Sequence, residues 1–331
     1  MIVTLTMNPA LDRTIVLDEP LQPGEVQLAR SAREDAGGKG VNVARVVAAA
    51  GAPVTAVLPL ASDDPYGTLI HQLPLRAVPV AGHARANLAI TDADGETTKI
   101  NLPGAAVSAG EAAALIDAVV EAADGAAWLA LCGSLPPGVA SDFYVDVMLA
   151  VRARASRPPR IAVDTSGPAL VEAVGCGAVD LIKPNDEELI ELVLGSMRTP
   201  RPLAPEEAER RAEALRREVA SDPAAVRQLV GAIVPHQVRA ALVTLGGAGA
   251  VLADADGVRI ATPPPTDVRS TVGAGDSALA GYLLADLAGE DAAGRLRSAI
   301  RHGSATAALP GTQLATPADL PAGDVPVRDL T

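Results

Sequence analysis

Short hydrophobic runs alternate along the chain with stretches of helical periodicity. The runs of strand length lie at 2–6, 54–60, 127–132, 160–164, 179–182 and 240–245, and the helical stretches lie at 41–50, 109–123, 141–155 and 205–220. Because strand–helix–strand repeats build parallel sheets with helices on both faces, this pattern predicts an α/β fold with a mostly parallel sheet. Ligands of such folds bind beyond the carboxyl ends of the strands.

Two half-polar segments interrupt the alternation. Residues 14–33 indicate two strands joined by a Pro/Gly turn, and residues 84–102 indicate a hairpin that turns at Asp94-Gly95. Half-polar strands suit a small sheet away from the main core. We therefore expect one discontinuous lid, inserted at about 12–34 and 84–102 into a single domain that spans 1–331. Ordinary edge strands of the main sheet are the alternative.

Two other segments are polar. Residues 206–218 alternate in charge sign after Pro205, which predicts a helix with a solvated face. The tail at 317–331 is rich in proline and aspartate, and we expect it to fray.

Composition narrows the possible partners and compartments. The 331 residues are 49% hydrophobic but only 2% aromatic, so the core must be built from small aliphatic side chains. The net charge of −13 argues against nucleic acid or anionic lipid as a general partner. Two cysteines are too few for a disulfide scaffold, and no apolar run is long enough to span a membrane. These features predict a cytoplasmic protein.

A run of small residues at 270–277 opens a helix and carries the sharpest chemical signal. Gly273 and Gly275 allow the backbone to turn its N–H groups inward, and a helix N-terminus adds partial positive charge, which suits a phosphate. Asp276 stands beside them, placed to take a proton from a hydroxyl. Asp276 could instead be an ordinary N-cap. The spacing Gly273-x-Gly275-x-x-Ala278 also matches a relaxed dinucleotide fingerprint, although no strand precedes it directly.

Three further stretches have the residue types of anion or nucleotide sites. Residues 37–45 combine glycine amides with Lys39 and Asn42, but they do not form a Walker loop. Lys183 follows a predicted strand, and Asn185 and Glu188 share a helix face that could hold hydrated Mg²⁺. Acidic residues that only interact favourably with the helix dipole at the start of a helix would give the same sequence pattern. Residues 244–250 form a glycine-rich turn that admits either a nucleotide or a plain β-turn.

Read together, these stretches resemble the ribokinase-like carbohydrate kinases of the PfkB family, and within it the phosphosugar kinases typified by 1-phosphofructokinase. The resemblance covers nearly the whole chain. Its most specific pieces are Asn8-Pro9-Ala10-x-Asp12, 37–45, 133–138, Lys183-Pro184-Asn185-x-x-Glu188 and 270–277. It implies a three-layer α/β/α fold with a small β lid, which often forms a dimer interface. It also implies Mg²⁺-assisted phosphoryl transfer from ATP to a ketohexose phosphate, foremost fructose 1-phosphate to give fructose 1,6-bisphosphate.

The resemblance also implies a role for each matching residue. Asp276 would be the base, and the amides of Ala274, Gly275 and Asp276, with Gly273 shaping the turn, would form an anion hole. The sugar hydroxyls would be bound by Asp12, Gly38, Asn42 and Asn101, and the existing phosphate by Lys39 and Arg85, helped by Ser134. Lys183 and Asn185 would bind ATP, as would the turn that contains Thr244, Gly246 and Gly249. Asn185 and Glu188 would bind the metal ion.

Three alternatives stay open on the sequence. Tagatose 6-phosphate or fructose 6-phosphate could be the substrate, because the motifs do not place its phosphate. A non-catalytic sugar-phosphate-binding regulator and a dinucleotide oxidoreductase belong to other classes. The chain also departs from the family pattern: it is shorter between Tyr66 and Arg85 and longer, by about two helical turns, between Gly195 and Ala240.

Overall fold

The computed structural model describes residues 1–196, 205–222 and 224–330. Within these ranges a ten-stranded sheet forms the centre of the molecule, in the order β14-β13-β12-β11-β10-β9-β8-β1-β4-β5. The seven strands from β11 to β5 in this order pair in parallel, and β12, β13 and β14 pair antiparallel at one edge. The predicted mostly parallel sheet is therefore confirmed. The strands are β1 (Ile2–Thr6), β4 (Val54–Pro59), β5 (Leu75–Val78), β8 (Trp128–Cys132), β9 (Arg160–Asp164), β10 (Val179–Ile182), β11 (Val238–Thr244), β12 (Ala250–Asp254), β13 (Gly257–Ala261) and β14 (Val327–Asp329).

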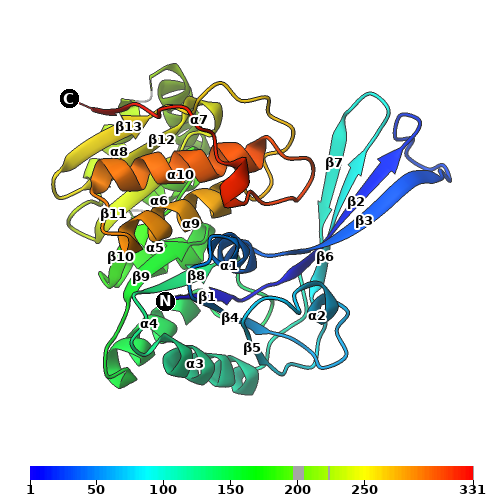
Figure 1. The fold of residues 1–331 in the computed structure, drawn as a ribbon, viewed down its shortest axis with the longest axis horizontal. Helices are drawn as coiled ribbons and strands as arrows, with labels where there is room; N and C mark the ends of the chain where they lie inside the picture. Colours follow the sequence, from blue (N-terminus) through cyan, green and yellow to red (C-terminus); the bar gives the residue numbers. More distant parts are fainter. Residues whose placement is uncertain (197–204, 223, 331) are drawn as a thin grey trace.

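Helices cover both faces of this sheet, which confirms the three layers (Figure 1). Apolar side chains pack from each helical layer onto the sheet in two separate clusters. One layer contains α1 (Lys39–Ala49), α9 (Ala274–Leu287) and α10 (Ala292–Ala307), with the short α2 (Tyr66–Leu69) nearby. The other contains α3 (Ala109–Ala123), α4 (Phe143–Arg154), α5 (Gly167–Gly175), α6 (Asp186–Ser196), α7 (Pro205–Ser221) and α8 (Ala225–Gly231).

The four half-polar strands form a second sheet, in the order β3-β2-β6-β7. It projects from the body of the molecule (Figure 1). The central pair, β2 and β6, is parallel, although the two strands come from distant parts of the chain. The strands are therefore not edge strands of the main sheet. They are β2 (Ala10–Leu17), β3 (Ala29–Gly37), β6 (Arg85–Thr91) and β7 (Thr97–Asn101).

The C-terminal tail differs from the expectation that it frays. β14 pairs antiparallel with β13, and Val325 and Leu330 are buried on either side of it. Val325, Val327 and Leu330 pack against the core at the sheet edge, and these contacts outweigh the proline and aspartate content of the tail. Thr331 lies outside the described residues.

The long segment before β11 supplies α7 and α8. Most of α7 is exposed, as its alternating charges predict, while Ala212 and Val219 are buried. The part of this segment at 197–204 lies outside the described residues. None of the helices in the described ranges has the length and hydrophobicity that a bilayer span requires.

Candidate active site

Polar residues gather where the central parallel strands end. Asp164 is the last residue of β9, Lys183 directly follows β10, and Thr244 is the last residue of β11. Because these three strands are neighbours in the sheet, their carboxyl ends bring the side chains to one edge. Asn185 continues the pairing as an isolated bridge to Thr244.

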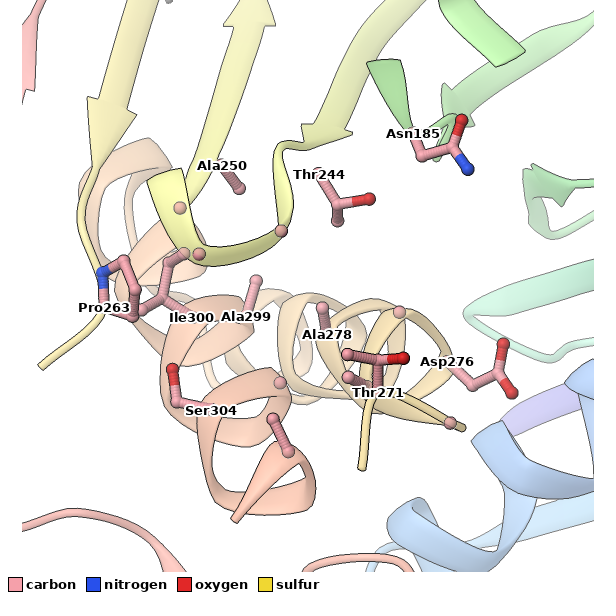
Figure 2. Close-up of a pocket in the computed structure, with 18 of the residues that line it drawn as sticks. Asn185, Thr244, Ala250, Pro263, Thr271, Asp276, Ala278, Ala299, Ile300 and Ser304 are labelled. Carbon is pink, nitrogen blue, oxygen red and sulfur yellow. The ribbon is translucent and has the colours of Figure 1, made fainter. Parts of the chain in front are cut away.

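A cavity of about 570 Å³ opens at this edge. Asp276 lies at one end of it, and small apolar residues such as Pro263 and Ile300 lie at the other (Figure 2). Such a cavity suits an elongated ligand with one anionic end and one flat apolar end. It brings together the predicted residues Lys39, Lys183, Asn185, Glu188, Thr244, Gly246, Gly249, Gly273, Ala274, Gly275 and Asp276.

Gly273 makes the turn that opens α9 towards the cavity. Its φ of 76° is left-handed, and a Cβ at this position would lie 2.7 Å from Cδ2 of Leu314. Ser277 donates the first helical hydrogen bond to the Gly273 carbonyl, so the N–H groups before it have no helical acceptor. The Ala274 N–H makes a long bond of 3.4 Å to the Thr271 carbonyl. The amides of Gly275 and Asp276 are therefore the donors best placed to bind an anion.

Asp276 is the third residue of α9, and the N-cap is Gly273. The N-cap interpretation of Asp276 is therefore wrong. The Asp276 side chain is buried, and its Oδ2 accepts a hydrogen bond from Nδ2 of Asn42 at 2.8 Å. Burial, followed by repulsion from Asp164, raises the pKa of Asp276 to about 6, against the opposing effects of Lys39, Asn42 and Lys183. A carboxylate with this pKa can accept a proton near neutral pH.

Two lysines approach Asp276 and share the buried carboxylate of Asp164. Lys39 Nζ lies 2.7 Å from Asp164 Oδ1, and Lys183 Nζ lies 3.3 Å from Oδ2. Burial alone would lower the pKa of Lys39, but Asp164 and then Glu188 outweigh it and raise that pKa. Lys39 thus lies in the cavity beside Asp276, and its predicted contact with the substrate's existing phosphate stays a prediction.

Asn185 and Glu188 form a reciprocal cap at the start of α6. The Glu188 N–H donates to Asn185 Oδ1 at 2.7 Å, and the Asn185 N–H donates to Glu188 Oε2 at 3.0 Å. The second Glu188 oxygen, Oε1, faces Lys39 at 3.7 Å. Among residues 1–196, 205–222 and 224–330, no group of three or more His, Cys, Asp or Glu side chains could form a metal cage. Glu188 is one of three carboxylates that line the cavity, with Asp186 and Asp276, and a single carboxylate contact fits Mg²⁺ that is held mainly by water and phosphate oxygens.

Three of the predicted substrate-binding residues, Asp12, Arg85 and Asn101, lie on the small sheet. Asp12 pairs with Asn87 on β6, and Asn87 pairs with Asn101 on β7, so the three share one face. Asn87 Nδ2 donates to Asp12 Oδ1 at 2.9 Å, and burial raises the pKa of Asp12. Arg85 precedes Asn87 on the same face, where its Nη1 donates to the Leu102 carbonyl at 3.3 Å.

The other predicted substrate residues surround the junction between the two sheets. Asn8 Nδ2 lies 3.4 Å from Ser134 Oγ, which joins the end of β1 to the end of β8. Gly38, with a φ of 118°, leads from β3 into α1. The amide of Asn42 donates to Asp276, a contact that the sequence did not predict.

Two polar residues of the site were missed on the sequence. Asp164 follows the apolar residues 161–163 at the end of β9, and that position alone was the signal, since an acid there faces the ligand edge. Asn87 is two residues from Arg85 in a strand, so the same face could have been expected for both. The apolar end of the cavity, which includes Ala299 and Ile300, could not be predicted from the sequence. Apolar residues of a helix that line a ligand site have the same sequence pattern as those that pack in the core.

The family model described as pfkB family carbohydrate kinase matches residues 5–319. The chain is 33% identical over 291 residues to a 1-phosphofructokinase of Xanthomonas campestris pv. campestris, covering 86% of this chain and 83% of the relative. It is 31% identical over 319 residues to the ATP-dependent 6-phosphofructokinase isozyme 2 of Escherichia coli, covering 95% and 94%. The crystal structure of Escherichia coli phosphofructokinase-2 in complex with potassium superposes with a TM-score of 0.79 and 28% identity, over 96% of each chain.

Proposed function

Because the chain belongs to the pfkB family of carbohydrate kinases, and so transfers a phosphoryl group to a sugar alcohol, we propose that it converts fructose 1-phosphate to fructose 1,6-bisphosphate with ATP. The placement of the Asp276 carboxylate beside the Gly273 turn, at the polar end of the cavity, carries the proposal. Relatives named 1-phosphofructokinase, at 32 to 33% identity over most of the chain, support this acceptor. A non-catalytic regulator would have no use for a buried base.

Each end of the cavity has a separate task in this reaction. The adenine and ribose would lie at the apolar end, near Ala299 and Ile300, and the triphosphate would extend towards Gly275. Asp276 would take the proton from the sugar hydroxyl as that oxygen bonds to the terminal phosphorus of ATP, while the bond from this phosphorus to the β,γ-bridging oxygen breaks and ADP leaves. Because Lys39 lines the cavity near Asp276, we assign it, together with Lys183, to the phosphoryl group in transfer and leave the existing phosphate to Arg85. The two lysines supply locally the positive charge that a chain of net charge −13 lacks.

We propose that Mg²⁺ binds beside Glu188, with Asn185 fixing the orientation of that carboxylate through the α6 cap. When bound, the ion would neutralise phosphate charge. The side chain of Glu188 would hold it through water, since the carboxylate also faces Lys39. Activity that persists at full rate in excess chelator would contradict this role.

The small sheet would bind the sugar and exclude water. Asp12, Asn87 and Asn101 present neighbouring carboxylate and amide groups that can bind hydroxyls, and Arg85 on the same face offers a cation to the existing phosphate. Closing such a lid keeps water from competing with the sugar as nucleophile. This role explains why a half-polar sheet stands away from the main core.

A substrate panel tests the choice of sugar. Purified protein is assayed by coupled ADP detection on fructose 1-phosphate, fructose 6-phosphate, tagatose 6-phosphate and fructose. We expect kcat/KM for the phosphosugars to exceed that for fructose by at least about tenfold, because a site with a phosphate-binding cation rejects an analogue that leaves it unpaired. Among the phosphosugars we expect fructose 1-phosphate to give the highest kcat/KM, which the relatives named 1-phosphofructokinase support. A preference for fructose 6-phosphate would favour the second candidate, a 6-phosphofructokinase, which the relative of that name supports. Equal rates on unphosphorylated fructose would refute a phosphosugar substrate.

We also propose that two copies of the chain associate through the small sheet. Val26 and Leu28, in the β2–β3 connection, are 97% and 89% exposed, and Ile100 on β7 is 47% exposed. Val26 and Leu28 are two residues apart in one connection, and such neighbouring exposed apolar side chains support a contact with a second copy there. Light scattering should therefore give a molar mass of twice 33.4 kDa for the wild-type protein. Leu28→Asp should lower the measured mass towards that of a monomer. A monomer at micromolar concentration would contradict the dimer.

A further inference from the structure

Asp164 is the buried centre of the charged cluster at the transfer end of the cavity. Its side chain is fully buried, with one oxygen 2.7 Å from Lys39 Nζ and the other 3.3 Å from Lys183 Nζ. Both lysines line the cavity, whereas Asp164 lies behind them. We propose that Asp164 is a positioning residue, which holds the two ammonium groups where the terminal phosphoryl group of the nucleotide is transferred. This inference rests on the proposed function.

The backbone around Asp164 fixes the position of its carboxylate. The Asp164 carbonyl accepts a hydrogen bond from the Gly133 N–H at 2.8 Å, which ties it to the end of β8. On the other side, the Lys183 N–H donates to the Val163 carbonyl at 3.0 Å. Asp164 is therefore held between the two neighbouring strands of the main sheet, whose positions the buried core sets.

The two lysines need such a partner because they come from separate elements. Lys39 is the first residue of α1, which follows the small sheet, and Lys183 follows β10 in the main sheet. A lysine side chain is a flexible stem with a compact charge, so its ammonium group points where its counter-charge lies. Without Asp164 the two like charges would repel each other. Lys39 would keep an ion-pair partner in Glu188 at 3.7 Å, whereas Lys183 would keep only the longer-range attraction of Asp276.

The position of the Lys183 ammonium group indicates which phosphate of the nucleotide the two lysines would contact. A Cβ added to Gly275 would lie 3.2 Å from Lys183 Nζ, so this ammonium group stands directly beside the first turn of α9. Asp276, the proposed base, is in the same turn. A phosphorus that an Asp276-activated hydroxyl attacks must lie between these groups, and it is the third phosphorus of ATP. ADP, which lacks this phosphorus, would not contact the pair in the same way.

The test compares the binding of a non-hydrolysable β,γ-imido analogue of ATP with the binding of ADP, by calorimetry. In Asp164→Asn we expect the analogue affinity to fall by about tenfold or more, as for loss of a partner that orients a binding group, while the affinity for ADP stays within about twofold. The kcat should fall by about 10- to 100-fold on the same basis. Asp164→Glu, which keeps the charge, should recover part of both losses.

Asp286→Asn is the matched control. The Asp286 carboxylate is also nearly buried and contacts two cations, Arg160 and Arg295, but it lies at the opposite end of α9. This variant should lose stability in thermal unfolding without changing the ratio of analogue to ADP affinity. The proposal is overturned if Asp164→Asn leaves that ratio at the wild-type value.

A double substitution separates positioning from a direct role. In a Lys39→Met, Lys183→Met background, Asp164→Asn should cause no further loss of analogue affinity, because the groups it positions are gone. An equal loss in both backgrounds would overturn the proposal. If Asp164→Asn does not fold, Lys39→Met and Lys183→Met are measured singly. Each should lower the affinity for the ATP analogue and leave the affinity for ADP unchanged. An unchanged ratio of the two affinities in both variants would also overturn the proposal. These binding measurements need no sugar, so they stand even if the proposed acceptor fails.

Discussion

Asp276→Asn should lower kcat by about 10²- to 10⁴-fold, the range for removal of a general base, and leave the affinity for the ATP analogue within about twofold. The amide is nearly isosteric with the carboxylate and can keep a hydrogen bond to Asn42, but it cannot accept the hydroxyl proton. The N–H groups of the first turn and the two lysines remain in place, so nucleotide binding persists. Steady-state kinetics on the best sugar of the panel, with calorimetry for the nucleotide, measures both quantities.

The pH dependence of the wild-type protein provides an independent test of the same role. The base must be ionised to act, and its pKa is raised to about 6 by burial and by Asp164. We therefore expect kcat/KM to rise about tenfold per pH unit below pH 6 and to level off above it. Near-full activity in Asp276→Asn, or a profile that stays flat from pH 5 to 7, would contradict the assignment of Asp276 as the base.

Gly273→Ala should lower kcat by about 10²- to 10³-fold, which is the usual cost of a lost oxyanion donor. A side chain in this left-handed conformation costs about 1–2 kcal/mol, and the added Cβ would lie only 2.7 Å from Leu314. To relieve the contact the turn must shift, and the amides of Gly275 and Asp276 shift with it. Kinetics and thermal unfolding of the variant report the two effects separately.

Gly289→Ala is the control for backbone strain. Gly289 lies just beyond the other end of α9 with a similar φ of 78°, and a Cβ there meets nothing within 4 Å. It should lower stability by a comparable amount and leave kcat unchanged. If Gly273→Ala also loses only stability, then the turn does not contribute to the transfer step.

The features that the sequence predicted well are those encoded within a few residues. The turn at Gly273, the acid that follows it and the start of α6 after Lys183 are all local, and the structure has each of them. The apolar periodicity likewise predicted the strands that carry Asp164 and Thr244, because burial on both sheet faces leaves a continuous hydrophobic run.

Contacts between distant segments were the part that could not be predicted. Asn42 and Asp276 are 234 positions apart, and nothing near either residue indicates that they meet. Asp164 depends on two lysines from different elements, so its role is visible only once the sheet order is known. The tail was misjudged for a related reason: three well-spaced apolar residues, Val325, Val327 and Leu330, determined its pairing, and composition alone hides such spacing.

The junction between the small sheet and α1 has almost no slack. Gly37 is the last residue of β3 and Lys39 is the first of α1, so Gly38 alone joins them. One residue spans only about 3.5 Å of extended chain, so a swing of the small sheet must be absorbed by the backbone rotations of Gly38 itself. Because buried residues of α1 pack this helix onto the main sheet, the hinge of any such swing lies directly beside Lys39, which lines the cavity.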